Sequence, residues 1–153
     1  MQTRAASTHT AASYDEAEIR RQVEEWGEAL RAKDRDKLTS FYTSDFMAFD
    51  LAPPLVHGLD DTKTGLEQWF ATWKGPIGFE VRNLRVTCDG EVGFTTSLNH
   101  LTGTRTSGDV TDVWVRATVC FRKVAGAWKV VHEHVSVPFY MDGSYRAAVD
   151  LKP

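Results

Sequence analysis

The chain has 153 residues, enough for one domain with its own hydrophobic core. Hydrophobic residues make up 42% and charged residues 25%, which excludes wholesale disorder and collagen-like or coiled-coil sequences. The formal net charge of −3 gives no basic field for nucleic acid, and the apolar runs are far shorter than the roughly 20 residues that span a bilayer. We expect neither a nucleic-acid nor a membrane partner.

The first third of the chain has helical spacing. Residues 1–12 lack the apolar core of a signal peptide and are expected to form a flexible tail. Ser13 and Glu16 form a capping-box pattern, and apolar residues at 4-3-4 spacing behind them predict a helix over about 14–33. Asp34 is expected to cap a second, shorter helix whose inner face is Leu38, Phe41 and Tyr42.

A short strand is expected at 46–50, before Pro53-Pro54, and a third helix after Gly58. The inner stripe of this helix is predicted to be Leu66, Trp69, Phe70 and Trp73. From Ile77 onward the apolar period changes from 3.6 to 2, which predicts four strands at about 77–89, 92–104, 110–124 and 127–138. Helices followed by an antiparallel meander indicate an α+β fold.

Valines on the last two predicted strands bear on the oligomeric state. We assign one set of them to the outer face of the sheet: Val113, Val115, Val119, Val131, Val135 and Val137. An apolar outer face left in water would be unfavourable, so the pattern predicts a homodimer through the sheet. The alternative is that a C-terminal segment covers this face within one chain.

Two sets of residues resemble a known family. The first comprises Trp26, Ala32-Lys33-Asp34, Leu38, Tyr42, Asp45-Phe46, Asp50, Pro54, Gly58 and Phe70. The second comprises Gly103-Thr104, Arg116, Thr118, Gly126, Trp128-Lys129-Val130 and the ending His132-Glu133-His134-x-Ser136-x-Pro138. Together they resemble the SnoaL-like, ketosteroid isomerase-like branch of the NTF2-like superfamily.

The resemblance implies a cone in which three N-terminal helices pack on a strongly curved, mostly antiparallel sheet and enclose a pocket. It places the domain at 13–139 and leaves 140–153 as a C-terminal extension. The superfamily includes isomerases, polyketide cyclases, dehydratases and association domains, so the fold alone does not give the reaction.

Asp50 is the first candidate catalytic residue. It ends an apolar strand, where burial would raise its pKa toward that of a general base. In ketosteroid isomerases an Asp at the matching place moves a proton next to a carbonyl. The alternative is a loop-capping Asp that accepts hydrogen bonds from the backbone N–H groups of residues 52–57. His57, which follows the Pro-Pro segment, is expected to approach the same space.

His132, His134 and Ser136 share strand parity with Trp128 and Val130. If these two apolar residues pack on the helices, the histidines face the pocket, with His134 the deeper and catalytic one. A His-x-His pair on a strand is also a metal-ligand spacing. We favour histidines hydrogen-bonded to polar groups of the pocket, and expect no metal.

Arg116 alternates with Trp114 and Thr118 and is expected to face inward, where a guanidinium needs an anion. It either binds the substrate oxygen or pairs with a carboxylate such as Asp50. The resemblance places Trp26 and Thr118 where isomerases carry their oxyanion donors. The expected ligand-binding set is Trp26, Tyr42, Trp69, Trp73, Trp114, Thr118, His132 and Ser136.

The sequence therefore predicts a small enzyme without a cofactor that moves a proton on an apolar carbonyl compound, by isomerisation, cyclisation or dehydration. Asp50 would be the base, with His134, His57 and Arg116 orienting the substrate. The alternative is a dimeric ligand-binding or association module without turnover. Cys88 and Cys120 show no disulfide or zinc spacing, which is typical of a cytoplasmic protein.

Overall fold

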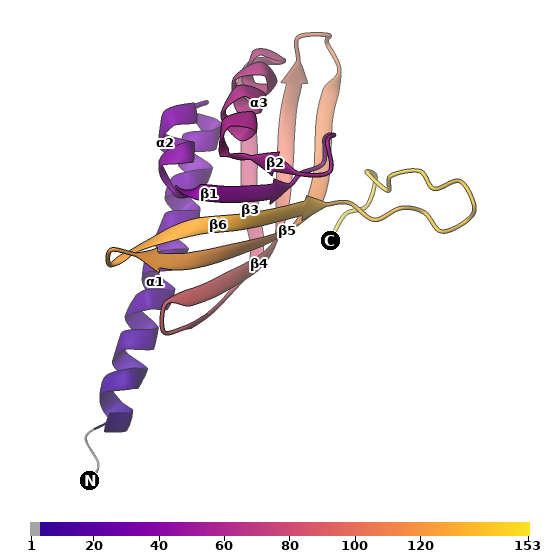
Figure 1. Ribbon diagram of the computed structural model, residues 1–153. Helices are drawn as coiled ribbons and strands as arrows, with labels where there is room; N and C mark the ends of the chain where they lie inside the picture. Colours follow the sequence, from indigo (N-terminus) through magenta and orange to yellow (C-terminus); the bar gives the residue numbers. More distant parts are fainter. Residues whose placement is uncertain (1–3) are drawn as a thin grey trace.

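The computed structural model describes residues 4–153, with side chains from Tyr14 onward. Three helices accompany one six-stranded sheet (Figure 1). In chain order the elements are α1 (Arg4–Arg31), α2 (Arg35–Ser40), β1 (Tyr42–Phe49), β2 (His57–Gly58), α3 (Leu59–Ala71), β3 (Trp73–Asp89), β4 (Val92–Arg105), β5 (Val110–Val124) and β6 (Ala127–Ser136). The α+β fold with a curved sheet is confirmed.

The sheet has the strand order β2-β1-β6-β5-β4-β3. Neighbouring strands are antiparallel except for β1 and β6, which run parallel. We call the face toward α1 the inner face and the opposite one the outer face. β3 is an edge strand and lies beside α1 (Figure 1).

Helix α1 begins at Arg4, about ten residues earlier than the capping box indicates. Ser13 therefore lies inside the helix, and the expectation of a loose segment is wrong for residues 4–12; residues 1–3 lie outside the described part. The second helix follows the prediction, because Asp34 Oδ1 accepts the Lys37 backbone N–H at 2.9 Å.

Two aromatic residues assigned to helices belong to strands. Tyr42 begins β1 and pairs with Val130 of β6, because α2 already ends at Ser40. Trp73 begins β3 and pairs with Arg105, since α3 ends at Ala71. In the sequence, the apolar residues keep helical spacing beyond the end of each helix, so the spacing does not reveal where the backbone becomes extended.

A β-bulge in β6 decides which side chains face inward. Cys120 of β5 is opposite His132, but the next residue, Phe121, is opposite Val130, so Val131 has no partner on β5. The extra residue reverses the alternation of β6. Trp128 and Val130 are buried as predicted, yet His132 comes to the outer face.

Three of the valines assigned to the outer face lie on the inner face. Val119 of β5 and Val135 of β6 line the inner cavity, and Val115, on the same side of β5 as Val119, is buried. The outer face instead exposes Met47, Phe49 and Phe94. The apolar outer face that suggested a dimer is therefore made of other residues.

The chain after β6 projects from the sheet as a loop (Figure 1). Phe139 and Ala147 form an isolated β-bridge within it. Its end returns to the sheet, where Lys152 Nζ lies 2.6 Å from Asp112 Oδ1 of β5. The C-terminal extension is thus anchored at both ends.

Candidate functional site

A cavity of about 80 Å³ lies between α1 and the inner face of the sheet. Its walls are mostly apolar and include Val23, Phe79, Val119 and Val135. The polar residues that line it are Gln22, Trp26, Tyr42, Thr95, Ser97, Asn99 and Glu133. An apolar cavity with a few polar groups is the ordinary composition of a small-molecule site.

Three of these residues form a chain of hydrogen bonds from α1 to β6. Trp26 Nε1 donates to Tyr42 Oη at 3.0 Å, and Tyr42 Oη is 3.5 Å from Glu133 Oε2, to which it donates. The tyrosine is buried. Because Tyr42 Oη accepts the indole N–H of Trp26, the hydroxyl proton of Tyr42 is free to be donated to the Glu133 carboxylate. The chain fixes the position of the Glu133 carboxyl group.

Glu133 has the ionisation properties of a general base. Burial, and secondarily the negative charge of Asp50, raises the pKa of Glu133 from 4.5 to about 7, while the Tyr42 hydrogen bond opposes this shift. Burial and the nearby Glu133 carboxylate also raise the pKa of Tyr42 well above its usual value, so the phenol keeps its proton. At neutral pH the carboxyl group can both accept and return a proton.

Two more polar groups of the cavity have fixed orientations. Ser97 Oγ donates to Asn99 Oδ1 at 2.8 Å, which leaves the Asn99 NH₂ group as a donor. Gln22 Nε2 donates to the Trp128 carbonyl at 2.8 Å, whereas Gln22 Oε1 is buried and has no hydrogen-bond partner in the described part of the chain. Each leaves hydrogen-bonding capacity for a ligand.

The structure does not place Asp50 in the cavity. Asp50 follows β1, is exposed, and accepts the backbone N–H of its neighbour Leu51 at 2.6 Å, whereas the loop-capping alternative expected donors among residues 52–57. His57 lies in β2 and its Nε2 is 3.1 Å from the Ala52 carbonyl oxygen. Asp50 acts on the site through its charge, by raising the pKa of Glu133.

The expected inward histidines are on the outer face, and this expectation is wrong. His132 Nδ1 lies 2.8 Å from the Met47 carbonyl oxygen, and the Phe49 ring packs edge-on against both His132 and His134. Ser136 follows the same parity. The bulge at Val131 is the cause, because it moves these three side chains to the side opposite the cavity.

Arg116, Trp114 and Thr118 also face outward, because the inner face of β5 is formed by Val115, Ala117 and Val119. Among the described residues Arg116 makes no ion pair with Asp50. Trp114 stacks on His100, with ring centroids 4.3 Å apart, and Arg82 lies over the same indole. This aromatic stack belongs to the outer surface.

Trp69 and Trp73 pack in a separate core cluster below α3, with their ring centroids 5.3 Å apart. Arg105 lies 3.7 Å over the Trp73 ring. Neither indole lines the inner cavity. Of the twelve site residues expected from the sequence, only Trp26 and Tyr42 line it.

The model of the SnoaL-like domain family matches residues 19–140, most of the chain. The chain belongs to the SnoaL-like family. An NTF2-like protein of unknown function from Pseudomonas putida is 33% identical over 92% of this chain and 98% of its own, with a TM-score of 0.83. No curated protein matches the sequence.

Two more distant structures share the fold of this SnoaL-like domain. A ketosteroid isomerase-like protein from Erwinia carotovora is 22% identical over 80% of this chain and 95% of its own, with a TM-score of 0.69. The association domain of CaMKII from C. elegans is 15% identical over 82% of this chain and 98% of its own, with a TM-score of 0.67. The fold therefore occurs in proteins named for different roles.

Sequence reasoning missed Glu133, whose buried carboxyl group has its pKa raised to about 7 in this SnoaL-like domain. If side chains alternated strictly along the strand from Trp128, Glu133 would face outward, between the inward-facing His132 and His134. The adjacent pair Val130-Val131 was the available signal, because two successive apolar residues break a period of two. A bulge there exchanges the faces of everything that follows.

Within residues 4–153, no three His, Cys, Asp or Glu side chains described by the structure are grouped so that they could hold a metal ion. No helix in the same range is long and apolar enough to cross a membrane. Cys88 and Cys120 are not joined by a disulfide.

Proposed function

We propose that this SnoaL-like protein moves a proton on an apolar carbonyl compound bound in the inner cavity, without a cofactor. The observation that carries the proposal is the Glu133 carboxyl group, which lines an apolar cavity, accepts a hydrogen bond from Tyr42 and has a pKa of about 7. Glu133 replaces Asp50, the base expected from the sequence, because Asp50 is exposed.

The reaction needs one base and one hydrogen-bond donor. The Glu133 carboxylate accepts a proton from the carbon next to the carbonyl, and the electrons of that C–H bond form the carbon–carbon double bond of the enolate. The NH₂ group of Asn99, held by Ser97, is the donor that stabilises the negative oxygen. Glu133 then returns the proton, to another carbon in an isomerisation or to a departing hydroxyl in a dehydration.

The test uses cyclohex-3-enone, a small ketone whose isomerisation to the conjugated enone is followed by ultraviolet absorbance. We expect wild-type protein to accelerate the reaction, and Glu133→Gln to abolish the acceleration while it remains folded. Asp50→Asn is the comparison variant: it lowers the pKa of Glu133 but leaves the base in place, so it should retain activity. Loss of activity in Asp50→Asn with full activity in Glu133→Gln would return the role of base to Asp50.

The second candidate is a ligand-binding or association module without turnover. The small cavity favours it, since about 80 Å³ is well below the roughly 300–1,000 Å³ of typical ligand sites. Binding of a ketone to wild-type protein without proton exchange in D₂O would support this candidate.

A homodimer through the outer face remains part of the proposal, on corrected grounds. Met47, Phe49 and Phe94 are 38%, 36% and 44% exposed on that face, and burial of such side chains favours association. Sedimentation is expected to give a dimer, and Phe94→Lys to give a monomer. The cytoplasm remains the proposed compartment.

A further inference from the structure

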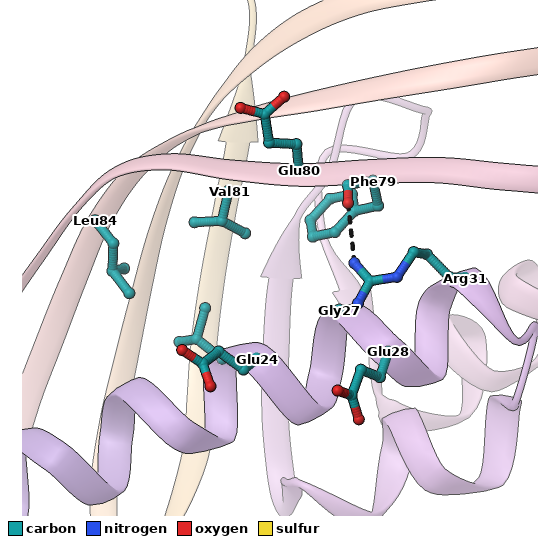
Figure 2. A pocket seen from close by; sticks show the side chains of 9 residues that line it. Glu24, Gly27, Glu28, Arg31, Phe79, Glu80, Val81 and Leu84 are labelled. Atoms are coloured by element: carbon teal, nitrogen blue, oxygen red, sulfur yellow. Dashed lines mark hydrogen bonds between the residues drawn. The ribbon is translucent and has the colours of Figure 1, made fainter.

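A groove of about 540 Å³ runs between α1 and the edge strand β3 (Figure 2). Arg31 closes one end, where its Nη1 donates to the Phe79 carbonyl at 2.9 Å. Arg20 marks the other end by donating to the Leu84 carbonyl at 3.4 Å. The six residues from Phe79 to Leu84 span at most roughly 17 Å, because the pairing of β3 is interrupted by a register shift after Arg82. The groove is therefore a short trough, better suited to a small molecule than to a passing peptide.

The groove and the inner cavity have a common wall. Val23, Phe79 and Val81 line both of them. The Phe79 ring packs edge-on against Trp26, with centroids 5.5 Å apart, and Trp26 donates to Tyr42. A molecule in the groove is thus one layer of side chains away from the hydrogen-bonded chain that ends at Glu133.

We infer that the groove is the outer part of the ligand site, separated from the cavity by Phe79. This inference rests on the proposed function, because it assumes that the carbonyl group binds beside Glu133. The cavity of about 80 Å³ holds only the reacting end of a ligand, whereas the groove has room for a chain attached to it. Movement of the Phe79 side chain joins the two spaces.

The groove also indicates the class of ligand. Its floor is apolar, with Val23, Val81 and Leu84. Backbone groups alternate along a strand, so the N–H and C=O of Val81 point to the same side as the Phe79 carbonyl, toward α1. The groove therefore accepts an aliphatic chain and offers one hydrogen-bond donor and one acceptor beside it.

The charged residues of the groove indicate which group the outer end of such an aliphatic ligand carries. Glu24 and Glu28 line the groove four residues apart on α1, are exposed, and have no ion-pair partner among the described residues. The third acidic residue, Glu80, is bound by Arg82. The single lining cation is Arg31, and Arg20 at the other end is already paired with Glu16 at 2.8 Å. The groove therefore favours a cationic end over an anionic one. The ligand assigned is an elongated ketone or aldehyde with a neutral or cationic outer end.

Gly27 provides a matched pair of variants. A Cβ at this position would lie 3.4 Å from Phe79 Cδ1 and 3.5 Å from Arg31 Nη1, so alanine makes only ordinary contacts. A leucine extends from the same point over the preceding turn and occupies part of the groove, of which Gly27 is a lining residue. Gly27→Leu is the test variant and Gly27→Ala is its control.

The experiment follows the amide signals of the folded protein by NMR during titration. The probes are 2-pentanone and 2-decanone, which differ only in chain length. We expect 2-decanone to shift Gly27 and Val81 in the groove together with Ser97 and Asn99 in the cavity, at one common affinity. Gly27→Leu should weaken 2-decanone roughly tenfold, the loss of about two buried CH₂ groups, and leave 2-pentanone unchanged.

The charge assignment has a second test that does not depend on Gly27→Leu folding. The 9-oxodecylammonium ion should bind more tightly than 9-oxodecanoate, and the surface double variant Glu24→Gln, Glu28→Gln should reduce the difference. Tighter binding of 9-oxodecanoate would overturn the assignment. Shifts by 2-decanone in only one of the two spaces would show separate sites, and absence of any cavity shift with either ketone would contradict the proposed function itself.

Discussion

The hydroxyl group of Tyr42 in β1 donates to Glu133 Oε2 in β6 at 3.5 Å, so the hydrogen bond joins two strands that lie at opposite ends of the domain sequence. Because β1 and β6 are neighbours, the two residues meet although they are far apart in the sequence. Trp26 completes the contact from α1. The ionisation of Glu133 therefore depends on residues of three separate elements.

Two substitutions should shift the pKa of Glu133 in opposite directions. The Tyr42 hydrogen bond stabilises the carboxylate, so Tyr42→Phe should raise the pKa above its value of about 7. The charge of Asp50 destabilises the carboxylate, so Asp50→Asn should lower the pKa. The measurement is a ¹³C NMR titration of the glutamate carboxyl groups, with Glu133→Gln used to assign the signal. Shifts of the same sign would contradict the placement of Tyr42 and Asp50 around Glu133.

Glu133 should also make the stability of the protein depend on pH. Between pH 4.5 and about 7 the unfolded chain has released the Glu133 proton while the folded chain retains it. The free energy of unfolding therefore falls as the pH rises through this interval, by on the order of 3 kcal/mol in total. Above the folded pKa both states are ionised and the loss is complete.

The Gln variant isolates this effect. Glu133→Gln keeps the shape of the side chain and cannot ionise, so we expect it to match wild type near pH 4.5 and to exceed its stability at pH 8. Urea unfolding at several pH values measures the difference. A difference that stays constant with pH would show that folding does not shift the pKa of Glu133.

The sequence was sufficient for the fold because its signals were local. The Asp34 cap and the period-two pattern after Ile77 depend on neighbouring residues, and the structure reproduces the short helix and the four-strand meander. The resemblance added the strong curvature of the sheet and the enclosed pocket. These features required no knowledge of contacts between distant residues.

The site was predicted less well, because it depends on which face each strand turns inward. One extra residue at Val131 exchanged the faces of His132 and Glu133, and a bulge is set by pairing with β5 rather than by local preference. Trp26 was placed correctly since helical spacing fixes its face. Tyr42 was correctly expected at the site, although the sequence assigned it to the second helix and it lies in β1.

Gly103 should tolerate no side chain. Its φ is +146°, and a Cβ there would lie 2.8 Å from Trp73 Cζ3 and 3.1 Å from the Pro76 carbonyl oxygen. Gly103→Ala should therefore destabilise the protein by about 1–3 kcal/mol in thermal or urea unfolding. The control is Gly65→Ala in α3, where nothing lies within 4 Å of the new Cβ and the helix should gain about 0.5–1 kcal/mol. Equal effects of the two variants would contradict the close contact with Trp73.

Asp15 should stabilise the protein at neutral pH and lose this effect in acid. Its side chain is 14% exposed and accepts hydrogen bonds from Lys123 Nζ and, at 3.1 Å, from Trp128 Nε1. The Lys123 hydrogen bond holds the pKa of Asp15 below its usual value. The unfolded carboxyl group takes up its proton first as the pH falls, so the stabilisation is present above about pH 4 and disappears as the pH drops through the folded pKa.

Asp15→Asn removes the charge while leaving an oxygen for Trp128. We expect a loss of about 1.5–3 kcal/mol at pH 7, the ordinary contribution of a hydrogen bond to a charged group, and a smaller difference from wild type at pH 3. Asp45→Asn is the matched control, because the Asp45–Arg122 pair is 63% and 46% exposed and exposed pairs contribute little. Urea unfolding at both pH values decides the outcome. A loss at Asp15 that is the same at pH 3 as at pH 7 would mean that side-chain packing rather than charge carries the contribution.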